Sequence, residues 1–178
     1  MEKIIKISKL DGAKRQLETA IRLYFSNGDP VSTHTLTCAA YNVIRDINKA
    51  RKGQPMLVKD QLKEKIKPEY RKYWSMKINE SETFFKHAEN DPDSVHDFNP
   101  SQTDLLILDA CTQYYKLTGE DPPLFKLLRV WYLMNNQKLF NLSEDVKKML
   151  EDCHKQAIDL GRERFFTLVL PQMMKINI

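Results

Sequence analysis

The sequence predicts an all-α fold, a single-domain bundle of about six or seven helices over residues 1–178. Apolar residues recur every three or four positions along most of the chain, the spacing that places them on one face of a helix. Proline and glycine gather between these segments, and no stretch alternates apolar and polar residues as a half-buried strand does. With 178 residues and 42% hydrophobic content, the chain is long enough to close one core.

The first two predicted helices form a hairpin. An apolar stripe from Leu10 to Tyr24 predicts a first helix of about 18 residues, which ends at the turn Asn27-Gly28-Asp29-Pro30. A second stripe, from Leu36 to Ile47, predicts the next helix, with Ser32 as its expected N-cap.

A short helix near Lys59 to Ile66 and a longer one that begins around Pro68 are predicted next, because proline suits the first helical turn. Pro92 prevents continuation of the longer helix, so a loop is expected from Asn90 to Pro100. The apolar positions of this helix form one broad face that we interpret as core: Tyr70, Tyr73, Trp74, Ile78, Phe84, Phe85 and Ala88.

Three start signals predict the remaining helices. Ser101 opens a helix that Gly119 ends, and Asp121-Pro122-Pro123 opens another. Ser143 opens a last amphipathic helix, which Gly161 is expected to break or kink. Phe165 to Leu170 is expected to dock as a terminal apolar turn.

Composition excludes several classes of protein. Apolar stretches are shorter than the roughly 20 residues that span a bilayer, and the N-terminus lacks a signal peptide's apolar run, so we expect a cytoplasmic protein with no membrane partner. Cys38, Cys111 and Cys153 are widely separated on apolar faces, which predicts buried free thiols. The sequence has no GxxxxGK[ST], GxGxxG or GxSxG motif, and no cofactor is expected.

Charge is distributed unevenly along the chain. Residues 45–77 hold eleven Lys or Arg against four Asp or Glu, whereas residues 80–121 hold two against ten. We interpret the basic stretch as a solvated face, with binding to a phosphate backbone or an acidic partner as the alternative. The two stretches are also able to pair with each other, within one chain or across a dimer.

Aromatic, charged and imidazole side chains are most concentrated from Thr83 to Pro92, with the sequence TFFKHAENDP. Glu80 and Glu82 precede His87 on the same predicted helix, so a carboxylate could orient this imidazole as a general base. The alternative is that His87 and Lys86 cap the helix C-terminus, where cationic groups are favoured. The candidate catalytic residues are His87, Glu82 and Lys86, and the candidate binding residues are Phe84, Phe85, Asp91, Arg71 and Lys72.

Other candidate sites have simpler interpretations. Asp91, Asp93, His96 and Asp97 could hold a divalent cation, but their spacing matches no established metal loop, so we interpret them as a solvated acidic loop and expect no metal. The aromatic residues beside the basic stretch could stack RNA bases, although aromatics at helical spacing are usually core. Surface or capping roles suffice for His34 and His154.

The segment AKRQLETAIRLYFSNGDPVSTHTLTCAAYNVIRDI, from Ala13 to Ile47, resembles the opening hairpin of HEPN-type domains. That resemblance implies a helical bundle that dimerises, and for many members RNA cleavage by an Arg and a later His with four to six residues between them. The positions at that distance before His87 are Glu80, Ser81 and Glu82, and none of them is Arg.

Three further phrases, HTLTCAAYNVIRDINKARKG, ETFFKHAENDPD and GEDPPLFKLLRVWYLMNN, are similar to a family of uncharacterised bacterial proteins of about this length. The resemblance implies that the His87 segment is a hallmark of the family. The leading hypothesis is a non-enzymatic interaction module that forms a homodimer in the bacterial cytoplasm. The alternative is an RNA-binding or RNA-processing protein with His87 as general base, and a third is a small-ligand or metal site near the His87 loop.

Overall fold

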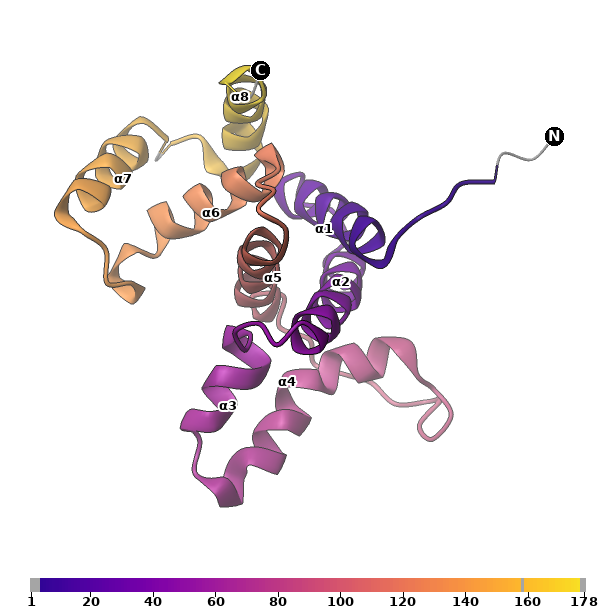
Figure 1. Cartoon of the computed structure of the whole chain (residues 1–178). Coiled ribbons are helices and arrows are strands. Elements are labelled where there is room, and N and C mark those ends of the chain that lie inside the picture. Colours follow the sequence, from indigo (N-terminus) through magenta and orange to yellow (C-terminus); the bar gives the residue numbers. More distant parts are fainter. Residues whose placement is uncertain (1–3, 158, 177–178) are drawn as a thin grey trace.

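Eight α-helices make up most of the computed structural model, which describes residues 4–157 and 159–176. They are α1 (Lys9–Phe25), α2 (Pro30–Ala50), α3 (Leu62–Lys65), α4 (Arg71–Lys86), α5 (Gln102–Thr118), α6 (Pro123–Asn135), α7 (Glu144–Ala157) and α8 (Gly161–Ile176) (Figure 1). Three short turns of helix accompany them: η1 (Leu57–Gln61), η2 (Pro68–Tyr70) and η3 (Gln137–Leu139). These ranges contain no strand, which confirms the predicted all-α fold, and no helix within them combines the length and hydropathy needed to cross a bilayer.

The core lies where α1, α2 and α5 pack together (Figure 1). Leu17, Ile21, Ile44 and Ile107 are completely buried there, and each such side chain contributes about 1.5–3 kcal/mol through removal from water. Buried alanines on all three helices allow close approach: Ala13, Ala20, Ala40 and Ala110. The apolar stripes of these three helices therefore face one common interior.

Helix α2 begins earlier than the sequence indicated. Asp29 is its N-cap and Pro30 its first residue, because the Asp29 Oδ1 atom accepts a hydrogen bond from the Ser32 N–H at 2.7 Å. The prediction that Ser32 caps this helix is wrong. Ser32 is instead the residue whose backbone N–H is capped, and proline occupies the first position because it needs no donor there.

The C-terminal segment forms a full helix and not the expected apolar turn. Helix α8 is a separate element after Gly161, whose φ of +65° marks the expected break from α7. Phe165 is buried and stacks on Phe25 with ring centroids 6.4 Å apart, while its centroid lies 5.0 Å from that of Trp131. Apolar residues at positions 165, 166, 169, 170 and 173 share one helical face against the core, which a single turn could not present.

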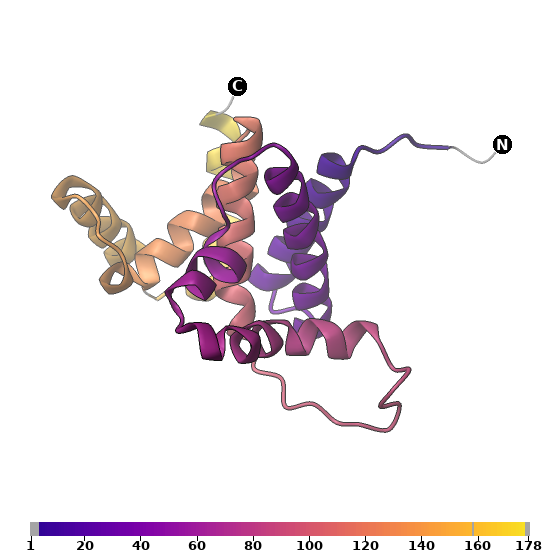
Figure 2. The ribbon, with the colours of Figure 1, turned by 60° about the horizontal axis from the view of Figure 1, so that its bottom comes forward.

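Helices α3 and α4 form a hairpin that projects from the bundle (Figures 1 and 2). The expected short helix occurs as η1 followed by α3, and the expected longer helix occurs as η2 followed by α4. The prediction that the whole apolar face of α4 is core is wrong, because Tyr70 and Tyr73 are each 58% exposed. These residues belong to the projecting half of the hairpin, where none of the described elements covers this face.

Candidate functional site

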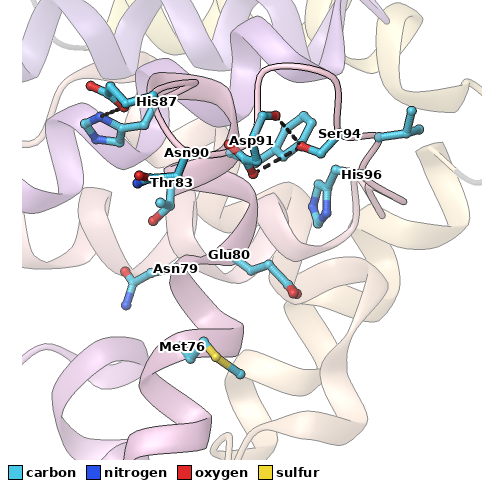
Figure 3. Close-up of a pocket in the computed structure, with 12 residues that line it drawn as sticks. Met76, Asn79, Glu80, Thr83, His87, Asn90, Asp91, Ser94 and His96 are labelled. Atoms are coloured by element: carbon cyan, nitrogen blue, oxygen red, sulfur yellow. Dashed lines mark hydrogen bonds and ion pairs between the residues drawn. The ribbon is translucent and has the colours of Figure 1, made fainter.

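Helix α4 carries the predicted site residues on two different faces. Glu82 is buried on the inner face, and Phe85 packs against His34 there, with ring centroids 6.0 Å apart. Thr83 and His87 lie on the outer face, where they line an open pocket (Figure 3). The residues named together by their closeness in sequence thus belong to two separate environments.

The inner face of α4 is built around the Glu82 carboxylate. Lys59 Nζ lies 2.6 Å from Glu82 Oε2, and Lys86 Nζ lies 2.7 Å from Glu82 Oε1. Asn42 donates to the same Oε1 through its Nδ2 and accepts a hydrogen bond from Lys59 Nζ at 3.1 Å. This arrangement joins α2, η1 and α4 through one carboxylate.

Burial and the two lysines act in opposite directions on the Glu82 carboxyl. Burial alone raises its pKa, but hydrogen bonds from Lys59 and Lys86 and their positive charges outweigh that effect and lower the pKa to about 2. The group is therefore an anion at neutral pH. Its affinity for a proton is too low for a general base that works near pH 7.

A second buried carboxylate extends this network into α5. Asp109 Oδ2 accepts hydrogen bonds from the Tyr41 hydroxyl at 2.7 Å and from the Val58 N–H at 3.0 Å. Tyr41 in turn accepts from the Lys59 N–H at 3.2 Å, and Lys59 Nζ lies 5.3 Å from the centre of the Tyr41 ring. Burial, followed by the nearby Asp109 charge, raises the pKa of the Tyr41 hydroxyl, which keeps it protonated as the donor.

His87 occupies the C-cap position of α4. Its backbone is extended, with φ −134° and ψ 139°, and its N–H donates to the Thr83 carbonyl at 3.1 Å. Its side chain is 60% exposed, and Glu89 is the carboxylate beside it, at 3.7 Å between Nδ1 and Oε2.

The expected carboxylate partners of His87 are engaged elsewhere. Glu82 lies five residues before His87, which on a helix places it about 140° around the axis on the inner face. Glu80 shares the outer face but pairs with Lys77 at 2.9 Å. The expectation that Glu82 or Glu80 orients the His87 ring is therefore wrong for this structure.

The pocket beside His87 is an open hollow of about 520 Å³ between α4 and the loop that follows it. Figure 3 shows His87 and His96 at opposite ends of the pocket, with Asp91 and Ser94 between them. The floor on α4 is formed by Met76, Asn79, Glu80, Thr83 and Phe84. Acidic and imidazole groups thus line one concave surface, although they do not converge on a point.

His96 is fixed by the helix and not by its acidic neighbours in the loop. Its Nε2 lies 2.8 Å from the Ser81 hydroxyl, and its ring centroid lies 5.1 Å from that of Phe84. Asp91 accepts hydrogen bonds from the Ser94 hydroxyl. Throughout residues 4–157 and 159–176, no three His, Cys, Asp or Glu side chains come together as a metal site.

The remaining predicted binding residues divide into structural and exposed ones. Arg71 pairs with Glu64 at 3.0 Å and donates from Nε to the Ile66 carbonyl at 3.1 Å, so it fixes the connection between α3 and α4. Phe84 and Phe85 are half-buried, whereas Lys72 is exposed. The Phe85 ring packs edge-on against the rings of His34 and Phe98.

His34 is buried, so the expected surface or capping role for it is wrong. The side chain is 1% exposed, its Nδ1 lies 2.9 Å from the Thr103 hydroxyl, and its Nε2 lies 3.4 Å from Cys38 Sγ. Burial lowers the pKa of the imidazole to about 4 and raises the pKa of the Cys38 thiol to about 12, so both groups are neutral at pH 7.

Sequence reasoning missed the residues that hold the interior network together. Lys59, Asn42 and Asp109 received no role, yet each has polar contacts inside the protein. A signal was present for Asp109, because it lies within the apolar run LLILDAC of α5. His34, Cys38 and Tyr41 also recur at helical spacing and share the inner face of α2.

No protein-family model, curated protein or solved structure matches this chain. The similarity to HEPN-type domains and to uncharacterised bacterial proteins stays a prediction.

Proposed function

We propose that this protein is a non-enzymatic helical interaction module that works as a homodimer in the bacterial cytoplasm. The observation that supports the absence of catalysis is the pairing of Glu82 with Lys59 and Lys86. This pairing uses Glu82, the carboxylate expected to orient His87, to hold α2, η1 and α4 together. His87 lies on the other side of α4, where the carboxylate beside it is the exposed Glu89, at 3.7 Å between Nδ1 and Oε2.

Self-association is supported by the exposed N-terminal segment, residues 4–8. Ile4 and Ile5 are 91% and 59% exposed, and the segment leaves the bundle beside α1 (Figure 1). A hollow of about 330 Å³ lies at its base, lined in part by Ile7, Gly12 and Val43. Two copies related by a two-fold axis would each place this segment on the partner's α1–α2 surface, so one contact would be made twice.

Light scattering at micromolar concentration tests the homodimer. The wild-type protein is expected at twice the 20.9 kDa mass of one chain, and an Ile4→Ser/Ile5→Ser variant at the mass of one chain. Val95→Ser is the matched control, because Val95 is 93% exposed in the loop after α4. A wild-type monomer at this concentration would contradict the homodimer.

Incubation with a mixed RNA pool tests the absence of catalysis. RNA processing with His87 as base requires cleavage by the wild-type protein that is lost in His87→Ala. We expect the RNA to stay intact with both proteins. Cleavage by the wild type alone would replace the non-enzymatic proposal with the RNA-processing one and locate its base.

A further inference from the structure

The free end of the α3–α4 hairpin, residues 63–77, exposes aromatic side chains that no other part of the described chain covers. Tyr70 and Tyr73 are each 58% exposed, and Met76 is 55% exposed. A spacing of three residues places them on the same side of the helix. Large apolar side chains gathered on one exposed face are typical of a binding surface.

The same segment carries excess positive charge. Residues 63–77 include six Lys or Arg and two Glu. Two of the cations are engaged, Arg71 with Glu64 and Lys77 with Glu80. The other four are Lys63, Lys65, Lys67 and Lys72, and within residues 4–157 and 159–176 the structure records no hydrogen bond or ion pair for their side chains.

The basic surface continues from the hairpin onto α2. A groove of about 650 Å³ lies between the C-terminal end of α2 and α3, and its lining includes Arg45, Lys49, Lys63 and Lys65. Asp60 and Glu64 also line the groove. The Asp60 carboxylate accepts hydrogen bonds from the Arg45 guanidinium and lies 3.9 Å from Lys49 Nζ, and Glu64 pairs with Arg71. Both acidic groups therefore have cations beside them, and the groove stays favourable for an anion.

The hairpin holds this surface in a defined shape. Arg71 donates from Nε to the Ile66 carbonyl and from Nη2 to the Glu64 carbonyl at 3.0 Å, which fixes the connection between its helices. The pairing of Lys59 with Glu82 fixes the root of the hairpin to the bundle. A preformed surface loses less conformational entropy when a ligand binds.

We infer that residues 63–77 and the adjacent groove bind single-stranded nucleic acid, with bases stacked on Tyr70 and Tyr73 and phosphates near Lys65, Lys67 and Lys72. Single strands expose base faces that aromatic rings stack on, whereas a duplex buries them, and lysines pair with the backbone without regard to sequence. Charge complementarity selects a polyanion, and the exposed rings select one with unpaired bases. The binding needs no chemistry at His87.

Fluorescence anisotropy with labelled oligouridylate and oligothymidylate of about 20 nucleotides tests this inference at low salt. Both are expected to bind the wild-type protein, and a preference for one identifies RNA or DNA as the source. Tyr70→Ala/Tyr73→Ala is expected to weaken the affinity about tenfold or more with little change in its salt dependence. Lys65→Gln/Lys67→Gln/Lys72→Gln is expected to reduce the slope of log affinity against log salt by about 2.

Tyr115→Ala is the matched control, because Tyr115 is 48% exposed on α5, outside this surface, and its loss is expected to leave affinity unchanged. The inference is overturned if neither strand binds at low salt, or if the tyrosine variant binds as tightly as the wild type. If a duplex bound as tightly as a single strand, or if polyglutamate displaced the labelled oligonucleotide as well as an unlabelled single strand does, charge alone would account for binding. Either result would also overturn the inference. The homodimer is measured separately by light scattering.

Discussion

Lys59 and Glu82 form an ion pair in the interior, 2.6 Å apart, with their residues only 5% and 8% exposed. Removal of two charges from water costs several kcal/mol per ion unless further hydrogen bonds compensate. Here Lys86 and Asn42 supply them. Because Lys59 lies in η1 and Glu82 in α4, the two charges are paired only when these two segments lie in this one arrangement.

Disruption of this pair from one side is expected to be costly. Lys59→Met leaves the buried Glu82 carboxylate without its closest cation and should lower the free energy of unfolding by about 3–5 kcal/mol, as measured by urea denaturation. The Lys59→Met/Glu82→Leu double variant should lose less than the two single variants together. Lys77 and Glu80 form an exposed ion pair that serves as the control. A double-mutant cycle on this pair should give a much smaller coupling free energy than the cycle on Lys59 and Glu82. Additive losses for Lys59 and Glu82 would contradict the role of the pair.

Stability is expected to fall as the pH decreases from about 6.5 to about 4. Burial lowers the pKa of His34 from 6.5 to about 4 in the folded protein, so the unfolded chain binds this proton first. The full shift corresponds to about 3 kcal/mol of stability, present above pH 6.5 and lost as the pH falls through the folded pKa. Urea titrations across this range measure it, with His34→Gln as the variant that lacks the dependence. An equally steep dependence in that variant would assign the effect to other groups.

The N-terminus of α2 offers a test of which side chain caps it. Asp29→Ala removes the acceptor for the Ser32 N–H and should lower the melting temperature by a few degrees. Ser32→Ala keeps the backbone N–H that donates this hydrogen bond and should leave the melting temperature nearly unchanged. Calorimetry distinguishes the two, and the reverse order of effects would restore Ser32 as the cap.

The contribution of α8 to the core is measured by Phe165. Phe165→Ala removes a ring that is 3% exposed between Phe25 and Trp131, and should cost about 3–5 kcal/mol of unfolding free energy. Leu168→Ala on the same helix is the control, because Leu168 is 50% exposed and its loss should have little effect. Equal small effects of both variants in urea denaturation would mean that α8 does not stabilise the core.

Most of the fold could be predicted from local signals. Gly119 ends α5 with a φ of +74°, and Pro123 begins α6, where the sequence placed these boundaries. The candidate site was harder to predict from the sequence. Residue spacing shows which side chains share a face of a helix, but it does not show which other elements pack against that face. Glu82 and His87 looked like one site in sequence, yet a rotation of about 140° separates them around α4.

Residue order alone determined which segments are helical, where most of them end, and that their apolar stripes demand one core, because propensity, proline and glycine act over a few residues. Only the tertiary structure decided that His34 is buried, that Tyr70 and Tyr73 are exposed, and that opposite charges from the basic and acidic stretches meet as Lys59 and Glu82. The physical reason is that burial and the electrostatics of an ion pair depend on what packs against a side chain, and here the packing joins segments distant in sequence.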